Sequence, residues 1–127
     1  MASAADDDVI SETIEVLSIA EVSPLLAGGG TGPFSEAELA YARDKSDPER
    51  RLAARLAAKR AAVRLLGSGV TESDIEVARV PGSAPRLRLS ERAQGALGKT
   101  GAATILVSLT HGREHAAAAV LLVRAKA

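Results

Sequence analysis

The spacing of hydrophobic side chains changes along this chain, and the changes divide it into predicted strands and helices. Residues 9–19 (VISETIEVLSI) are rich in β-branched side chains, which favour an extended backbone, so they predict a first strand. Four more strands are predicted from hydrophobic or alternating runs at residues 74–80, 86–89, 103–110 and 116–123. The segments PGSAP and HGRE separate the members of these last two pairs, so each pair is predicted to form a hairpin.

A short helix is predicted to begin at Ser35. Ser35 and Glu38 have the spacing of a capping box, in which each side chain bonds the backbone N–H of the other residue. Phe34 and Leu39 have the spacing of a hydrophobic staple. The preceding segment AGGGTGP predicts a loop, and it lacks the lysine and hydroxyl residue that a phosphate-binding loop requires.

The longest predicted helix runs from Pro48 to Leu66. Asp47 stands at the N-cap position, Pro48 suits the first helical position because it has no N–H to leave unpaired, and Gly67 is typical of a helix end. A third helix is predicted at residues 90–98. The order β-α-α-β-β-α-β-β predicts one α+β domain over residues 9–127, with an antiparallel sheet packed against the long helix. Residues 1–8 predict a disordered leader.

The amino-acid composition excludes several classes of function but does not identify one. Apolar residues make up 46% of the 127 residues, which suits a single folded domain. Aromatic residues make up only 2%, so a stacking platform for single-stranded nucleic acid is excluded. There is no cysteine, hence no disulfide or thiolate metal site. No signal peptide or bilayer-spanning run is visible, so we expect a cytoplasmic protein that does not bind membranes.

Charge is distributed unevenly, although the net charge is zero. Residues 1–22 contain six acidic residues and no basic one, whereas residues 43–64 contain eight basic and three acidic residues. A run of cations along one helix favours an anionic partner, but it is also typical of a solvated helix face. Zero net charge and the lack of a reader motif argue against nucleic acid as that partner.

The long helix combines a hydrophobic stripe with cations. Four residues form the stripe at helical spacing: Leu52, Leu56, Val63 and Leu66. Lys59 lies inside the stripe, where a lysine commonly directs its amine to the edge. Arg60 and Arg64 lie one turn apart on the flank, and Ala53 and Ala57 continue that flank. Small side chains beside two arginines predict room for a ligand.

Several phrases together resemble the holo-acyl-carrier-protein synthase family, the small 4′-phosphopantetheinyl transferases. The helix RLAARLAAKRAAVRLLGSGV is similar to the signature helix of that family, in which Lys-Glu-Ala is followed by a lysine and a Gly-x-Gly exit. The segments PFSEAELAYA, APRLRLSERA and VSLTHGREHAAAAV resemble three further family segments. The pieces occur in family order and cover most of residues 9–125, so the resemblance implies a 4′-phosphopantetheinyl-transferase-like fold.

The resemblance also implies a reaction and its partners. The family transfers phosphopantetheine from coenzyme A to a serine of an acyl carrier protein, a step of fatty acid biosynthesis. It uses Mg²⁺ held by an aspartate on the first strand and by the glutamate of Lys-Glu-Ala. Its small members form homotrimers with active sites between subunits.

Carried over to this sequence, the resemblance implies specific site residues. Glu15 stands in place of the aspartate, which makes Glu15 and Lys59 the catalytic candidates if the protein is active. Coenzyme A is expected at four residues: Lys59, Arg64, Ser108 and His111. Arg60 replaces the second metal-binding glutamate, and Glu21 replaces a family arginine that meets the carrier protein. Glu15 is the remaining metal candidate, and because magnesium prefers anionic oxygen ligands, the site is predicted to be lost.

Because Arg60 puts a guanidinium where the family has a carboxylate, the sequence predicts a salt bridge between Glu15 and Arg60 in place of the metal.

Three functions remain possible on the sequence alone. The first is a catalytically impaired family member that binds coenzyme A or an acyl carrier protein. The second is an active Mg²⁺-dependent transferase, with Arg60 or the remaining Glu15 serving the pyrophosphate. The third is a non-catalytic structural or partner subunit.

Overall fold

The computed structural model describes residues 8–27, 29–67 and 69–125. The predicted leader, residues 1–8, lies almost entirely outside the described residues. In chain order the elements are β1 (Val9–Ser18), η1 (Ile19–Glu21), α2 (Val22–Leu25), α3 (Glu36–Arg43), α4 (Pro48–Leu66), η2 (Glu72–Asp74), β2 (Ile75–Ala78), β3 (Arg86–Leu89), α5 (Glu91–Lys99), β4 (Thr104–His111) and β5 (His115–Val123). The predicted strands and the three longer helices are confirmed, and the short helix α2 and the two 3₁₀ turns were not predicted.

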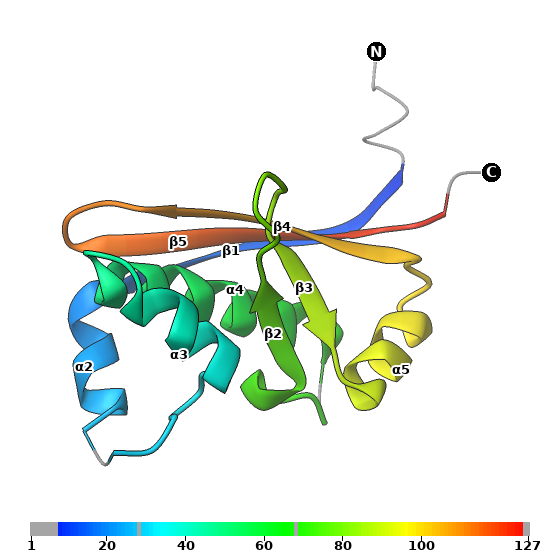
Figure 1. The fold of residues 1–127 in the computed structure, drawn as a ribbon. Helices are drawn as coiled ribbons and strands as arrows, with labels where there is room; N and C mark the ends of the chain where they lie inside the picture. The colour runs from blue at the N-terminus through cyan, green and yellow to red at the C-terminus, as the bar shows by residue number, and fades with distance from the viewer. Residues whose placement is uncertain (1–7, 28, 68, 126–127) are drawn as a thin grey trace.

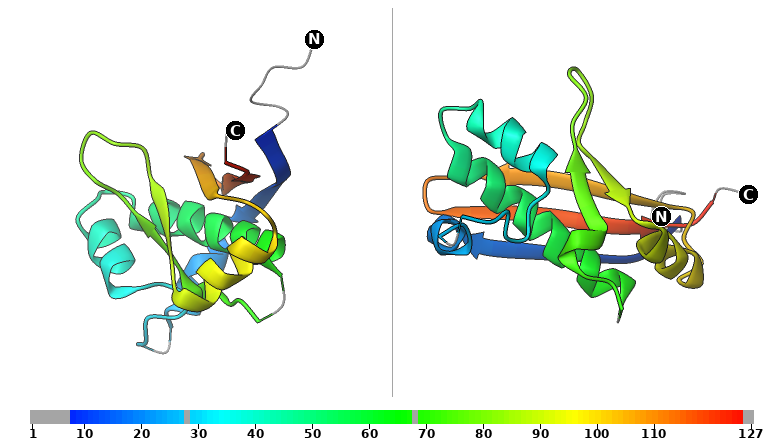
Figure 2. Two further views of the ribbon diagram at one scale, coloured as in Figure 1. Left: turned by 90° about the vertical axis from the view of Figure 1, so that its right-hand side faces the viewer. Right: turned by 60° about the horizontal axis from the view of Figure 1, so that its bottom comes forward.

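The strands form two antiparallel sheets rather than one. β1, β5 and β4 pair in that order, and β2 and β3 pair separately as a hairpin. Figure 1 shows α4 lying along the three-stranded sheet, with α5 at one end of it and α2 and α3 at the other. Figure 2 shows the loop between β2 and β3 projecting from the body of the molecule. The predicted single sheet is therefore corrected to two, because the hairpin turns away from the edge strand β4.

A capping box marks the start of α3, whereas α4 begins without a side-chain cap. Ser35 caps α3, and the predicted capping box with Glu38 is complete. Asp47 stands at the N-cap of α4 as predicted, but its side chain makes no capping hydrogen bond. Its carboxylate instead accepts from Nε of Arg51 at 3.0 Å, and that bond lowers the pKa of the Asp47 carboxyl.

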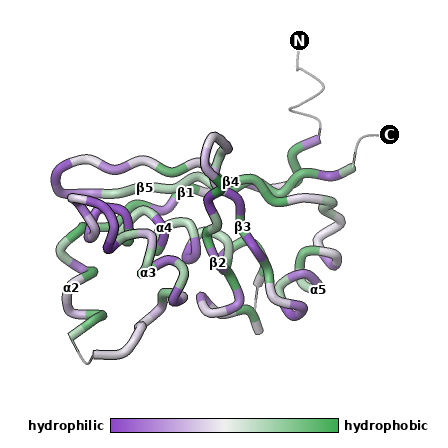
Figure 3. Tube along the Cα trace, in the orientation of Figure 1, coloured by the Kyte–Doolittle hydropathy of each residue, from purple (hydrophilic) through white to green (hydrophobic). Residues whose placement is uncertain are grey.

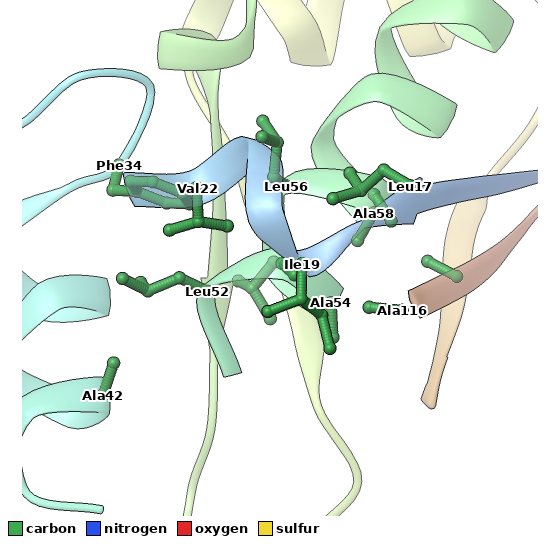
Figure 4. Close-up of a cluster of buried hydrophobic side chains, with 14 of the residues drawn as sticks. Leu17, Ile19, Val22, Phe34, Ala42, Leu52, Ala54, Leu56, Ala58 and Ala116 are labelled. Atoms are coloured by element: carbon green, nitrogen blue, oxygen red, sulfur yellow. The ribbon is translucent and has the colours of Figure 1, made fainter. Parts of the chain in front are cut away.

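The core forms around α4, which is buried on more than one face. The predicted stripe residues Leu52, Leu56 and Leu66 are buried, and Val63 is half-buried. Figure 4 shows leucines of α4 packed against Leu17 and Ile19. Each fully buried leucine contributes roughly 1.5–3 kcal/mol relative to an exposed one.

The alanines of α4 lie in the core and do not make room for a ligand. Ala53 and Ala57 are both fully buried, and so are Ala116 and Ala118 on β5. Small side chains on the helix and on the central strand let α4 pack closely under the sheet. The expectation that the alanine flank of α4 stays open is therefore wrong.

Hydropathy along the backbone follows this arrangement. In Figure 3 the turn joining β4 to β5 is hydrophilic, whereas much of β5 is hydrophobic. Within the described residues no helix has both the length and the apolar character needed to cross a membrane.

Candidate anion-binding site on helix α4

Lys59 and Glu38 form an ion pair inside the protein. The Lys59 Nζ donates to Oε1 of Glu38 at 2.6 Å, and the two side chains are 1% and 0% exposed. The same carboxylate accepts from the backbone N–H of Ser35 at 2.8 Å and from that of Val77 at 2.7 Å. Glu38 therefore ties α3 to α4 and β2, and the expectation that the Lys59 amine reaches the surface is wrong.

The burial of Lys59 bears on its predicted role. Its amine lies beneath α3, so in this structure no ligand reaches it. A buried, hydrogen-bonded ion pair of this kind is costly to break, because the remaining partner is left as an uncompensated charge. The contribution of Lys59 to catalysis stays a prediction, and its position favours a role in holding α3 and α4 together.

Arg60, the next residue, bridges two carboxylates near the surface. Its Nη1 lies 3.4 Å from Oε1 of Glu21, and its Nε lies 3.4 Å from Oε1 of Glu72. Glu21 ends the turn η1 after β1, and Glu72 begins η2, so one guanidinium connects two separate segments. The Arg60 side chain stays 33% exposed.

Arg64, one helical turn further, contacts β1. Its Nη1 donates to Oγ1 of Thr13 at 3.1 Å, and its Nη2 pairs with Oε2 of Glu15. The predicted salt bridge between Glu15 and Arg60 is therefore wrong, because Arg64 holds Glu15 and Arg60 holds two other carboxylates. Ion pairs between arginines of α4 and these carboxylates are present, with partners other than the predicted ones, and the loss of a metal site stays a prediction.

Magnesium does not fit this arrangement. The ion prefers several hard oxygen ligands in a near-octahedral shell. Here Glu15, Glu21 and Glu72 are each engaged by a guanidinium. The described part of the chain contains no group of three or more histidine, aspartate or glutamate side chains placed to hold a metal.

Ser108 and His111 alternate in side along β4. His111 ends that strand near Asp47 at the start of α4, whereas Arg60 and Arg64 lie towards the other end of the helix. Val107 and Leu109 pack towards the core from β4, so Ser108 between them faces the opposite side of the sheet, because side chains alternate along a strand. Both Ser108 and His111 are exposed. Since α4 covers the inner face of this sheet, a single chain does not bring Arg64 and Ser108 to one site.

Arg55 is a candidate binding residue that the sequence reasoning did not single out. It is 3% exposed, and its Nε is buried with no hydrogen-bond partner in the described part of the chain. The guanidinium carbon lies 4.1 Å from the centre of the Tyr41 ring, and Nη1 donates to the carbonyl of Arg51 at 3.3 Å. A cation three residues after Leu52, on the same side of the helix, is the sequence signal that points to it.

A pocket of about 200 Å³ opens beside Arg55. Tyr41, Arg79 and Arg88 also line it, together with Glu76, which pairs with Arg88 at 3.1 Å. Burial raises the pKa of Tyr41, but the guanidinium groups of Arg55 and Arg51 outweigh it and leave this pKa below the ordinary tyrosine value. Arginines outnumber the one glutamate in this lining, so the pocket has a positive potential, as an anion site requires.

Comparison with known proteins places the chain in a family. It is 38% identical over 118 residues to the holo-[acyl-carrier-protein] synthase of Anaeromyxobacter dehalogenans, covering 86% of this chain and 91% of the relative. It is 40% identical over 92 residues to the synthase of Moorella thermoacetica, covering 70% and 72%. This chain belongs to the holo-acyl-carrier-protein synthase family. If it is active, it is a phosphopantetheinyl transferase. No family model matches the sequence.

Solved synthase structures share the fold. The Neisseria meningitidis synthase superposes with a TM-score of 0.77 at 18% identity, covering 91% of this chain and 99% of that one. The Mycobacterium tuberculosis synthase gives a TM-score of 0.70 at 31% identity, covering 92% and 99%. The Helicobacter pylori synthase, solved in complex with coenzyme A, gives 0.72 at 22% identity, covering 88% and 99%. The predicted 4′-phosphopantetheinyl-transferase-like α+β fold is thereby confirmed.

Proposed function

We propose that this chain binds coenzyme A and an acyl carrier protein as a holo-acyl-carrier-protein synthase does, but that its Mg²⁺-dependent transfer is impaired. The observation that carries the proposal is the engagement of Glu15, Glu21 and Glu72 by Arg64 and Arg60. Phosphoryl transfer needs a cation where charge develops on the leaving phosphate. A site whose carboxylates are bound by arginines does not present oxygen ligands for the metal that supplies this cation.

The Arg55 pocket supports coenzyme A as the ligand. Coenzyme A carries a pyrophosphate and a 3′-phosphate, so a protein that binds it needs more than one anion site. The buried Arg55, with its unpartnered Nε, and the lining Arg79 and Arg88 form a cation cluster separate from Arg60 and Arg64. Guanidinium groups bind phosphate through paired hydrogen bonds. The Arg55 pocket therefore suits the 3′-phosphate of coenzyme A.

The outer face of the three-stranded sheet supports a homotrimer. Ile14 and Val16 of β1 and Leu106 of β4 are 67%, 58% and 51% exposed, and they project from the face opposite α4. An apolar sheet face of this kind favours burial against another protein surface. A second copy is the partner we propose, because the family resemblance implies active sites between subunits and Ser108, a residue expected at coenzyme A, shares this outer face.

The test combines binding with transfer. Calorimetry with coenzyme A measures binding, and mass spectrometry of an apo acyl carrier protein measures the gain of one phosphopantetheine, with the Moorella thermoacetica synthase as the positive control. The proposal expects coenzyme A binding with little Mg²⁺-stimulated transfer. Transfer matching the control, and stimulated by Mg²⁺, would establish the active enzyme instead. No binding of coenzyme A under any condition would leave a non-catalytic structural subunit.

A further inference from the structure

The family resemblance aligns Arg60 with a metal-binding glutamate, so a guanidinium is expected here beside the position of Mg²⁺, and the two cations differ in what they need. Mg²⁺ is held in proteins by one or two carboxylates together with waters and substrate phosphates, whereas a guanidinium is itself the cation and needs only anionic oxygens placed around its plane. Arg60 already lies between two such oxygens, from Glu21 and Glu72. Its Nη2 makes no hydrogen bond to any residue that the structure describes.

The bridge that holds Arg60 is weak enough to be exchanged. Both of its contacts are 3.4 Å long, and the Glu21 and Glu72 side chains are 47% and 36% exposed. Charge-assisted hydrogen bonds to phosphate are typically about 2.7–2.9 Å long, and exposed carboxylate pairs are worth little. A phosphate group can therefore replace one of these carboxylates at small cost.

A pocket lies beside Arg60 and is large enough for a diphosphate. Its volume is about 370 Å³, and Thr71 and Ser73 line it together with Arg60 and Glu72. The Thr71 hydroxyl lies 2.9 Å from Oγ of Ser73 and donates to Oδ2 of Asp74 at 3.3 Å, so a phosphate would bind these hydroxyl groups in exchange for their present hydrogen bonds. Ligand pockets commonly begin at about 300 Å³.

We infer that Arg60 binds the pyrophosphate of the ligand directly and without a divalent cation. The inference rests on the proposed function, because it takes coenzyme A to be the ligand. Two carboxylates face one guanidinium at this site, so it has a net charge of −1 until one carboxylate moves aside. Glu21, the more exposed of the two carboxylates, is the group that turns away when the phosphate enters.

The experiment measures the affinity for coenzyme A by calorimetry in EDTA and in excess Mg²⁺, and the affinity for inorganic pyrophosphate in EDTA. The inference expects coenzyme A affinities within about twofold of each other and detectable metal-free pyrophosphate binding. Arg60→Met should weaken both ligands at least roughly tenfold. Glu21→Gln should tighten both by about two- to fivefold, since it removes the competing carboxylate. Glu36→Gln, the same charge change at an exposed site on α3, should leave both affinities unchanged.

The outcomes separate this inference from the proposed function. Coenzyme A that binds at least tenfold more tightly with Mg²⁺ than with EDTA would overturn the inference while leaving the proposed function intact. An Arg60→Met variant that binds both ligands as the natural protein does would also overturn it. Pyrophosphate binding that needs Arg60, with no binding of coenzyme A, would retain the diphosphate site and remove the proposed function.

Discussion

Lys59 and Arg60 are neighbours on α4, yet their charges are held in opposite environments. The Lys59 amine is buried, with one carboxylate at 2.6 Å that two backbone N–H groups also bind. The Arg60 guanidinium is one-third exposed and touches two carboxylates at 3.4 Å. A step of about 100° around a helix separates them. The comparison teaches that the buried pair maintains the fold, whereas the exposed bridge remains available to a ligand.

The largest expected effect comes from breaking the buried pair. Lys59→Met leaves the Glu38 carboxylate buried without a counter-charge, and we expect a loss of about 3–5 kcal/mol in the free energy of unfolding. The matched variant Arg60→Met should lose less than about 1 kcal/mol, because it removes an exposed bridge. Urea denaturation measures both. Equal losses for the two variants would remove the distinction between the two sites.

A double variant sharpens the same point. Lys59→Met combined with Glu38→Gln removes both charges of the pair, while the glutamine oxygen can still accept from Ser35 or Val77. We expect the double variant to be more stable than Lys59→Met alone. A double variant that is less stable than the single one would show that an uncompensated charge is not what destabilises the protein.

The next largest effect is expected on the affinity for coenzyme A, when Arg55 is replaced. The charge of Arg55 is buried like that of Lys59, but it has no carboxylate partner among the described residues. Arg55→Met should weaken coenzyme A binding by roughly 10- to 100-fold, the effect of one hydrogen-bonded charge contact. Arg43→Met, an exposed arginine on α3, is the control and should bind coenzyme A as the natural protein does. Thermal melting checks that both variants are folded. Unchanged affinity in a folded Arg55→Met variant would exclude the Arg55 pocket as a phosphate site.

A smaller effect reports on the same pocket without a ligand. Tyr41 is the only tyrosine in the chain, so the absorbance of its phenolate follows one group. Its pKa in the folded protein should lie below the usual value, because Arg55 and Arg51 outweigh the effect of burial. The folded state then releases its proton before the unfolded state does, so this group adds stability as the pH rises through the folded pKa. Arg55→Met should raise the pKa, and an unchanged titration would mean that Arg55 does not act on the ring.

The sequence predicted the elements well because their signals are local. Hydrophobic periodicity placed the strands and helices, and the Ser35 capping box predicted the start of α3 correctly. The sites depend on how the elements pack, and local signals do not report that. Lys59 meets Glu38 only because α3 lies across α4, and Arg64 rather than Arg60 reaches Glu15 because packing sets where α4 lies along β1. The alanines of α4 were expected to leave space, and instead they allow close packing against the alanines of β5.

The central claim is that arginines occupy the metal position. A titration of the protein and coenzyme A with Mn²⁺, a spectroscopic substitute for Mg²⁺, tests this claim most directly. Electron paramagnetic resonance measures the free ion. The account predicts that the natural protein leaves the Mn²⁺ signal unchanged beyond what coenzyme A alone removes, and that Arg60→Glu, which restores a carboxylate, makes the signal fall. Stoichiometric Mn²⁺ binding by the natural protein, unaffected by Arg60→Glu, would contradict the account.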